Sequence, residues 1–220
     1  MATRVYSDTE IHRDVLAELD WDPEVDAKDI GVEVDNGVVT LTGTVDSYTK
    51  KWAAERAALR VAGVRAVAND IVVKSPTTRT DTDIAKAVAD ALEANSLVPK
   101  SRIKVTVKHG WVTLEGDVDW RFEREEAEST ARKVAGVTGV TNLIVVKQPS
   151  VSPSEIKEAI ERALVRSAEV DADRIQVHVE GGHVTLTGTV RSWAERQEAE
   201  AAAWRARGVT SVTNEIRVVP

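Results

Sequence analysis

The stretch Gly37-Val38-Val39-Thr40-Leu41-Thr42-Gly43-Thr44-Val45 decides the fold, because close copies of it recur twice further along the chain. The second copy begins at Gly110 and the third at Gly182, so the copies are 73 and then 72 residues apart. The same offsets relate apolar residues, glycines and asparagines on both sides of the stretch, from Ile11 to Asn69 in the first copy. A register held over that length predicts one module that is used three times.

Composition limits the classes of protein to be considered. The 220 residues carry a formal net charge of −7 and include no cysteine, so disulfides and thiolate metal sites are excluded. A net-acidic chain without a basic stripe argues against a nucleic-acid partner. No run of 18 apolar residues is present, which excludes a membrane-spanning helix. The first residues lack the basic and apolar regions of a secretory signal, so we expect a cytoplasmic protein.

Each repeat is expected to begin with a helix. Ser7, Thr80 and Ser152 occupy one register position as N-caps, with an acidic residue three positions later in each repeat. The helix that follows carries a stripe of apolar residues with a spacing of four: Ile11/Val15/Leu19, Ile84/Val88/Leu92 and Ile156/Ile160/Leu164. An apolar residue in the next loop is predicted to seal the core: Val25, Val98 and Val170.

Two strands, a second helix and a third strand are expected after the loop. Strict alternation predicts a first strand with one buried face, and the repeated stretch forms the second strand of the hairpin. An alanine-rich second helix then connects to a third strand. The third strand therefore runs parallel to the second, and it lies beside either the second or the first. The predicted class is α+β, with three αββαβ modules at 1–76, 79–148 and 152–220, each a three-stranded mixed sheet with two helices on one face.

Nine glycines are expected to determine the fold. They fall at three register positions: the hairpin turn, the interior of the second strand, and the end of the second helix. The first is Gly37, Gly110 and Gly182; the second is Gly43, Gly116 and Gly188; the third is Gly63, Gly136 and Gly208. We expect a bulge or a helix crossing close to the backbone at the second position. At the third position we expect a positive φ angle as a helix C-cap.

The sequence resembles the BON domain family, on the order helix–strand–strand–helix–strand, the pattern G-x-V-T-L-x-G-x-V, an A-G-V element and an asparagine near the last strand (Asn69, Asn142, Asn214). The three copies are similar to those of bacterial stress proteins with three BON domains and no export signal. The resemblance implies a non-enzymatic role in osmotic or envelope stress. It also implies phospholipid association or, in some cytoplasmic members, potassium binding. The matching residues are glycines and core aliphatics, which carry over no ligand-binding residue.

No catalytic, cofactor-binding or metal-binding residues are predicted. The sequence contains no nucleophile elbow, P-loop or dinucleotide fingerprint. His178 and His183 flank one hairpin, where a surface role is favoured over a two-histidine site. The acidic loop from Asp20 to Asp26 does not fit an EF-hand, which needs glycine and glutamate at its sixth and twelfth positions. Potassium held by backbone carbonyls is the one cofactor kept as an alternative.

The tryptophans break the repeat, since each occurs in one copy only. They therefore serve either contacts between modules or an external lipid, ligand or protein partner. Five residues near the start of the second helix in the second and third copies are the candidate partner or lipid contacts: Trp120, Arg121, Arg124, Trp193 and Arg196. The leading hypothesis is a non-enzymatic stress-associated binding or scaffold protein that engages a membrane surface, another protein or copies of itself. The alternative is a cytoplasmic potassium-binding or potassium-sensing protein.

Overall fold

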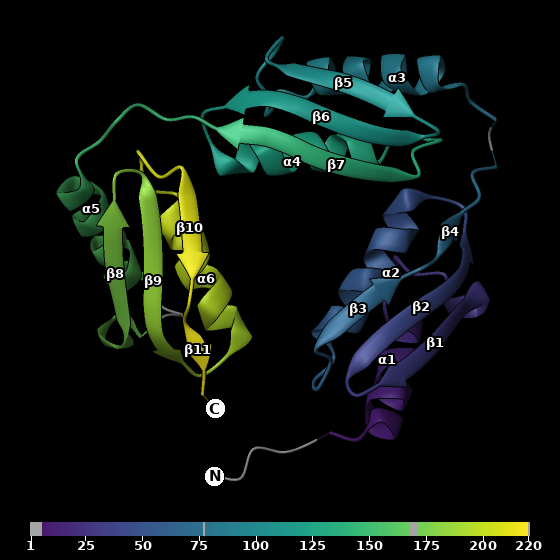
Figure 1. Ribbon diagram of the computed structural model, residues 1–220, viewed down its shortest axis with the longest axis horizontal. Coiled ribbons are helices and arrows are strands. Elements are labelled where there is room, and N and C mark those ends of the chain that lie inside the picture. The colour runs from purple at the N-terminus through teal and green to yellow at the C-terminus, as the bar shows by residue number, and fades with distance from the viewer. Residues whose placement is uncertain (1–5, 77, 168–170, 220) are drawn as a thin grey trace. The chain divides into compact units, whose positions relative to one another are not determined.

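The structure is a computed structural model that describes residues 6–76, 78–167 and 171–219. Val170 and the side chain of Trp193 lie outside the described residues. Three small β-sheets, each with two helices against it, are visible in Figure 1.

The chain divides into two compact units. The first consists of the described residues of Met1–Ser96, Lys104–Leu114 and Ala127–Asn142. The second consists of those of Leu97–Ile103, Glu115–Glu126 and Leu143–Pro220. The middle repeat therefore contributes to both units.

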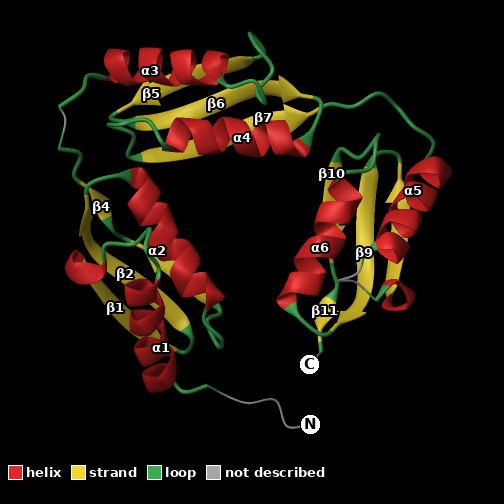
Figure 2. Cartoon of the chain, turned by 180° about the vertical axis from the view of Figure 1, so that it is seen from behind, coloured by secondary structure: helices red, strands yellow, loops and turns green. Residues whose placement is uncertain are grey.

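The predicted element order is found in all three modules. The first contains α1 (Asp8–Trp21), the short 3₁₀ helix η1 (Ala27–Asp29), β1 (Ile30–Asp35), β2 (Val38–Val45), α2 (Tyr48–Arg60), β3 (Ala66–Asn69) and β4 (Val72–Val73). The second contains α3 (Asp81–Ala94), β5 (Ile103–Lys108), β6 (Trp111–Val118), α4 (Arg121–Arg132) and β7 (Gly139–Val146). The third contains α5 (Pro153–Arg166), η2 (Ala172–Arg174), β8 (Ile175–Glu180), β9 (His183–Val190), α6 (Trp193–Trp204), β10 (Ser211–Asn214) and β11 (Arg217–Val218). The α+β class is confirmed, with the two helices of each module on one face of its sheet (Figure 2).

The second strand is the centre of each sheet, which settles the alternative left open by the sequence. β2 pairs antiparallel with β1 and parallel with β3 and β4, and β9 pairs in the same way with β8, β10 and β11. In the middle module the order is β5-β6-β7. The third strand thus forms beside the second, and its backbone is parallel to it.

The prediction of one continuous third strand is wrong for the first and third modules. β3 and β4 are separated by Asp70 and Ile71, although the paired residue numbers differ by 28 on both sides of the gap (66 − 38 and 72 − 44). No residue is inserted. The gap lies opposite Gly43, whose φ of 122° turns the backbone of β2 away from regular extended geometry.

The first helices form as the sequence predicts. All three have a capping box, in which the N-cap hydroxyl and the acidic side chain three positions later each accept from the other's backbone N–H. The nine stripe residues are buried, as is Val98, and Val25 packs partly buried against the core of the first module. Each first helix therefore packs on its sheet through one narrow apolar face.

The glycine in the middle of the second strand is required by a close backbone approach. A Cβ at Gly43 would overlap the carbonyl oxygen of Asp29, the residue just before β1, and Gly116 and Gly188 face the carbonyls of Arg102 and Arg174 in the same way. All three glycines have a positive φ. The close approach was expected, and it comes from the residue just before the preceding strand, which in the first and third modules is the last residue of the 3₁₀ helix η1 or η2.

The glycine after the second helix has a positive φ in every module, as predicted: 90° at Gly63, 94° at Gly136 and 91° at Gly208. Its position differs from the prediction, because α2 ends at Arg60 and the glycine is the third residue of the turn that follows. That turn is closed by the N–H of Val64, which donates to the carbonyl of Val61 at 3.3 Å. A glycine at the third position is the signature of a type II turn.

The hairpin turn is held by the first helix in two of the three modules. Asn36 and Gly37 have the positive φ values of a type I′ turn, and the carboxylate of Asp8 accepts from both of their N–H groups at 2.8 and 2.9 Å. Asp81 does the same for His109 and Gly110, and these backbone donors lower the pKa of Asp81. The equivalent position in the third module is Pro153, which has no carboxylate.

Candidate functional site

A repeated asparagine–glutamate pair fixes the second helix to the third strand. The Asn69 side-chain amide donates to Glu55 at 3.0 Å, Asn142 donates to Glu128 at 3.1 Å, and Asn214 donates to Glu200 at 3.1 Å. The glutamates are in register, fourteen residues before each asparagine. The spacing of fourteen residues is visible in the sequence, although the pair was not predicted.

A groove in the second compact unit has Glu200 in its wall. Its volume is about 740 Å³. It lies between the start of α4 and helix α6 with its C-cap, and it is lined by Trp120, Arg121, Phe122, Glu125, Gln197, Glu200, Ala201, Trp204 and Arg205. Three of the nine are aromatic, and Phe122 is 51% exposed. The groove is thus an open aromatic surface with charged groups at its sides.

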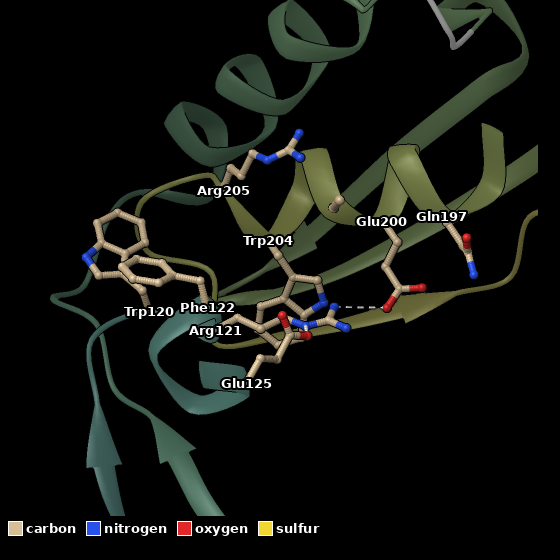
Figure 3. Close-up of a pocket in the computed structure, with 9 residues that line it drawn as sticks. Trp120, Arg121, Phe122, Glu125, Gln197, Glu200, Trp204 and Arg205 are labelled. Atoms are coloured by element: carbon tan, nitrogen blue, oxygen red, sulfur yellow. Dashed lines mark hydrogen bonds and ion pairs between the residues drawn. The ribbon is translucent and has the colours of Figure 1, made fainter. Parts of the chain in front are cut away.

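Arg121 lines the groove and contacts its other side. Its guanidinium lies 4.8 Å from the centre of the Trp204 ring, a cation–π contact, and donates to Glu125 at 2.6 Å and to Glu200 at 3.1 Å (Figure 3). The indole Nε1 of Trp204 is buried and has no acceptor among the described residues. A buried donor without an acceptor costs about 1–3 kcal/mol.

Two donors determine the ionisation of Glu200. Burial alone would raise its pKa, but the hydrogen bonds from Asn214 and Arg121 outweigh burial, and the pKa is lowered from the ordinary value of 4.5. A carboxylate at neutral pH is therefore built into the wall of the groove.

The lowered pKa of Glu200 predicts a pH dependence of stability. A carboxyl group with a depressed folded-state pKa stabilises the protein above its unfolded-state pKa, and this contribution is lost as the pH falls through the folded-state value. We expect the melting temperature of the third module to fall below about pH 4.5 more steeply than in Glu200→Gln, which lacks the titrating group. Thermal scans across that range measure the difference, and identical slopes would contradict it.

The five predicted contact residues are only partly brought together. Trp120 and Arg121 line the groove, and Trp193 is the first residue of α6. Arg196 instead donates to the backbone carbonyls of Asn214 and Ile216, at 2.7 and 3.0 Å, and so satisfies the edge of the third strand. Neither Arg124 nor Arg196 lines the groove. Phe122, Glu200 and Trp204 were not predicted, although Trp204 was noted as specific to its copy.

The first compact unit contains a related contact. The guanidinium of Arg132, the last residue of α4, lies 3.7 Å from the centre of the Trp52 ring, and its carbonyl accepts from the hydroxyl of Thr49 at 3.3 Å. Burial raises the pKa of Tyr48, one residue before Thr49. Trp52 and Trp204 therefore serve contacts between successive repeats, which was one of the two predicted roles.

The other tryptophans and the histidines have separate surroundings. Trp21 is exposed at the end of α1, and the Trp111 indole lies across Gly139 and donates to Thr141 at 2.8 Å. His178 pairs with Glu180, and the His183 ring contacts Ser211 and Thr213.

Among the described residues, no group of three or more histidine or carboxylate side chains has the geometry of a metal site. No helix in the described ranges is long and apolar enough to cross a membrane.

Comparison with known proteins gives matches over the whole length of the repeats. A sequence profile described as the BON domain matches residues 7–75, 80–148 and 152–220. The chain is 32% identical over 146 residues to osmotically-inducible protein Y of Escherichia coli (strain K12), covering 64% of this chain and 73% of that protein. It is 33% identical over 129 residues to the 21 kDa hemolysin of Actinobacillus pleuropneumoniae, covering 56% and 64%.

Solved structures give more distant similarities. CdsD, described as a structural protein of the type III secretion system of Chlamydia trachomatis, aligns with 15% identity and a TM-score of 0.28 over 94% of this chain and 91% of that one. The PrgH periplasmic domain aligns with 10% identity and a TM-score of 0.23, over 87% and 95%. The profile matches and the similarity to osmotically-inducible protein Y are the decisive findings, and they show that this chain belongs to the BON domain family, with three copies in tandem.

Proposed function

We propose that this chain is a non-enzymatic, stress-associated binding protein whose groove at α4 and α6 takes an apolar side chain of a protein partner. The BON family is associated with stress and generally non-catalytic. The observation that carries the proposal is the open aromatic groove, with Phe122 half-exposed at its mouth. Aromatic residues in such a position are enriched at the centre of protein interfaces.

Local charge favours a protein segment over an anionic membrane surface. The two arginines of the groove are already paired, Arg121 with Glu125 and Glu200, and Arg205 with Glu198 at 2.7 Å. Anionic headgroups are attracted by unpaired basic side chains, and the chain has a net charge of −7. An extended peptide needs no such attraction, since an apolar anchor that fills the aromatic groove suffices.

The proposal predicts that binding depends on Phe122. Peptides with one central phenylalanine or leucine are titrated against the chain, and the tryptophan emission is followed because Trp120 and Trp204 line the groove. Phe122→Ser should weaken binding about tenfold or more, which corresponds to the loss of one buried aromatic anchor. Leu143→Ser is the matched control, because Leu143 is 53% exposed but is not a groove residue. It should bind like the parent chain.

Two outcomes contradict the proposal. Equal peptide binding by the Phe122 and Leu143 variants would mean that the groove is not the peptide-binding site. Binding to phospholipid vesicles, neutral or anionic, that depends on Phe122 while the peptides do not bind would assign the groove to a membrane surface. The potassium alternative stays a prediction, tested by calorimetry with potassium against sodium, where equal heats exclude a selective site.

A further inference from the structure

Helices α5 and α6 of the third module lie side by side and leave a second groove between them, with a volume of about 470 Å³. Alanines of both helices line it, together with one serine, one glutamate and three arginines. The charged residues are Arg166, Glu198, Arg205 and Arg207. They give the groove a local charge of +2 in a chain whose net charge is −7. The groove is therefore a basic site on an acidic protein.

The first module shows what lies at the same place between its own two helices. Arg60 of α2 donates to the carboxylate of Glu18 at 2.8 Å and to that of Asp22 at 2.6 Å. Glu18 belongs to α1, and Asp22 is its C-cap. The two carboxylates of the first helix thus pair with an arginine of the second helix, and the pairing is made within the module.

The third module has the arginine but lacks both carboxylates. Arg205 stands at the position of Arg60, 145 residues later in the chain. At the positions of the two carboxylates the third module has Ala163 and Ser167. Arg205 donates instead to Glu198 on its own helix, at 2.7 Å. The short side chains of α5 therefore leave open the space that two acidic side chains occupy in the first module.

Two further arginines of the groove have no basic counterpart in the first module. Arg166 and Arg207 stand at the positions of Trp21 and Ala62. Both are exposed, and neither forms an ion pair within the part of the chain that the structure describes. A guanidinium group offers parallel N–H donors that match the two oxygens of a carboxylate. The groove thus has carboxylate-binding donors in addition to the equivalent of Arg60.

We propose that the groove between α5 and α6 binds an acidic segment of a partner protein, whose carboxylates take the place that Glu18 and Asp22 have in the first module. Arg166 and Arg207 donate to these carboxylates, and the alanines leave room for the segment. Clusters of arginines are a common means of recognising acidic motifs. This site is separate from the aromatic groove of the proposed function, although Arg205 lines both.

The positions of the two arginines set the spacing of the acidic residues. Arg166 is the last residue of α5. Arg207 precedes Gly208, where an added Cβ would lie 3.0 Å from Ile156, near the other end of α5. Ten residues of helix separate Ile156 from Arg166, a length of about 15 Å. In an extended segment, side chains four residues apart are on the same side and about 13 Å apart. We therefore expect acidic residues with a spacing of about four.

A labelled peptide with two glutamates four residues apart, and with no aromatic residue, tests the proposal by fluorescence anisotropy. Arg207→Gln should weaken its binding about tenfold, as expected for the loss of one charge-assisted contact. Arg162→Gln is the matched control, because it removes the same charge from α5, but Arg162 pairs with Glu158 and is not a groove residue. It should bind like the parent chain. The same peptide with glutamines in place of the glutamates should not bind.

Restoring the carboxylates of the first module tests the comparison between the repeats. In Ala163→Glu/Ser167→Asp the new side chains should pair with Arg205, as those of the first helix pair with Arg60. Binding of the acidic peptide should then be lost, while circular dichroism shows an intact fold. A folded double variant that binds the peptide like the parent chain overturns the inference.

Three other results also overturn it. The first is an absence of binding up to millimolar acidic peptide. The second is equal binding by Arg207→Gln and Arg162→Gln, which would mean that Arg207 serves only the negative end of a helix dipole. The third is binding to anionic phospholipid vesicles that depends on Arg207 while the peptide does not bind, which would assign the groove to a membrane surface. Phe122→Ser should bind the acidic peptide like the parent chain, so the two proposals fail separately.

Discussion

Gly188→Ala is expected to destabilise the third module by about 3 kcal/mol or more, because the new Cβ would overlap a backbone carbonyl that cannot move. That carbonyl belongs to Arg174, the residue immediately before the neighbouring strand β8. Its displacement would break the pairing of Ile175 with Gly188 in the sheet. Hydrogen exchange of the β8 and β9 amides, read module by module, measures the loss directly.

The control substitution Gly181→Ala distinguishes the effect of steric overlap from the effect of backbone strain alone. Gly181 lies in the same module and also has a positive φ, 57°, but a Cβ there would have no atom within 4 Å. Its substitution should therefore cost about 1 kcal/mol, the strain of the left-handed region. Equal effects of the two substitutions would mean that the close approach at Gly188 is not what selects glycine.

Asn214→Asp is expected to destabilise the third module by about 3 kcal/mol at neutral pH. The asparagine amide donates to Glu200 and to the Arg196 carbonyl, and its oxygen accepts from the Ile216 N–H. The substitution keeps the acceptor but removes both donors. It also places a second carboxylate beside Glu200, at a position where the nitrogen is 3.1 Å away. Urea unfolding at neutral pH measures the effect.

The pH dependence identifies the cause. Two carboxylates held together raise the pKa of the pair, so the penalty should shrink below about pH 5 as one of them takes up a proton. Thr213→Asp adds the same charge to an exposed neighbour on β10, and its effect should stay within about 0.5 kcal/mol. A penalty that does not change with pH would refute the proposed repulsion.

The repeat explains why so much of the fold could be predicted. A residue needed by the module returns three times, so the buried stripe that starts at Ile11, the glycine at Gly43 and the positive φ at Gly63 were all visible in one sequence. The position of the third strand in the sheet could not be predicted, because a helical crossover allows it to lie beside either the first or the second strand. Opposite Gly43, the gap in that strand depends on the local twist of β2, which alternation of apolar residues does not encode.

The candidate site was harder to predict, because it is built from residues that do not repeat. The copy-specific Trp120 and Arg121 were recognised, but their partners on α6 depend on how one repeat meets the next. Arg196 looked like a surface contact, yet it donates to backbone carbonyls of its own module. Glu200 could have been predicted, because its two equivalents, Glu55 and Glu128, stand in register. Its pairing with Asn214 was not recognised.

The central claim is that the groove at α4 and α6 receives an apolar side chain of a partner protein. Its most direct test follows the backbone amide chemical shifts of the nitrogen-labelled chain as a peptide with one central phenylalanine is added. We predict changes at residues 120–125 and 197–205, with the first module unaffected. Shifts concentrated on the open face of a sheet, or none up to millimolar peptide, would contradict the account.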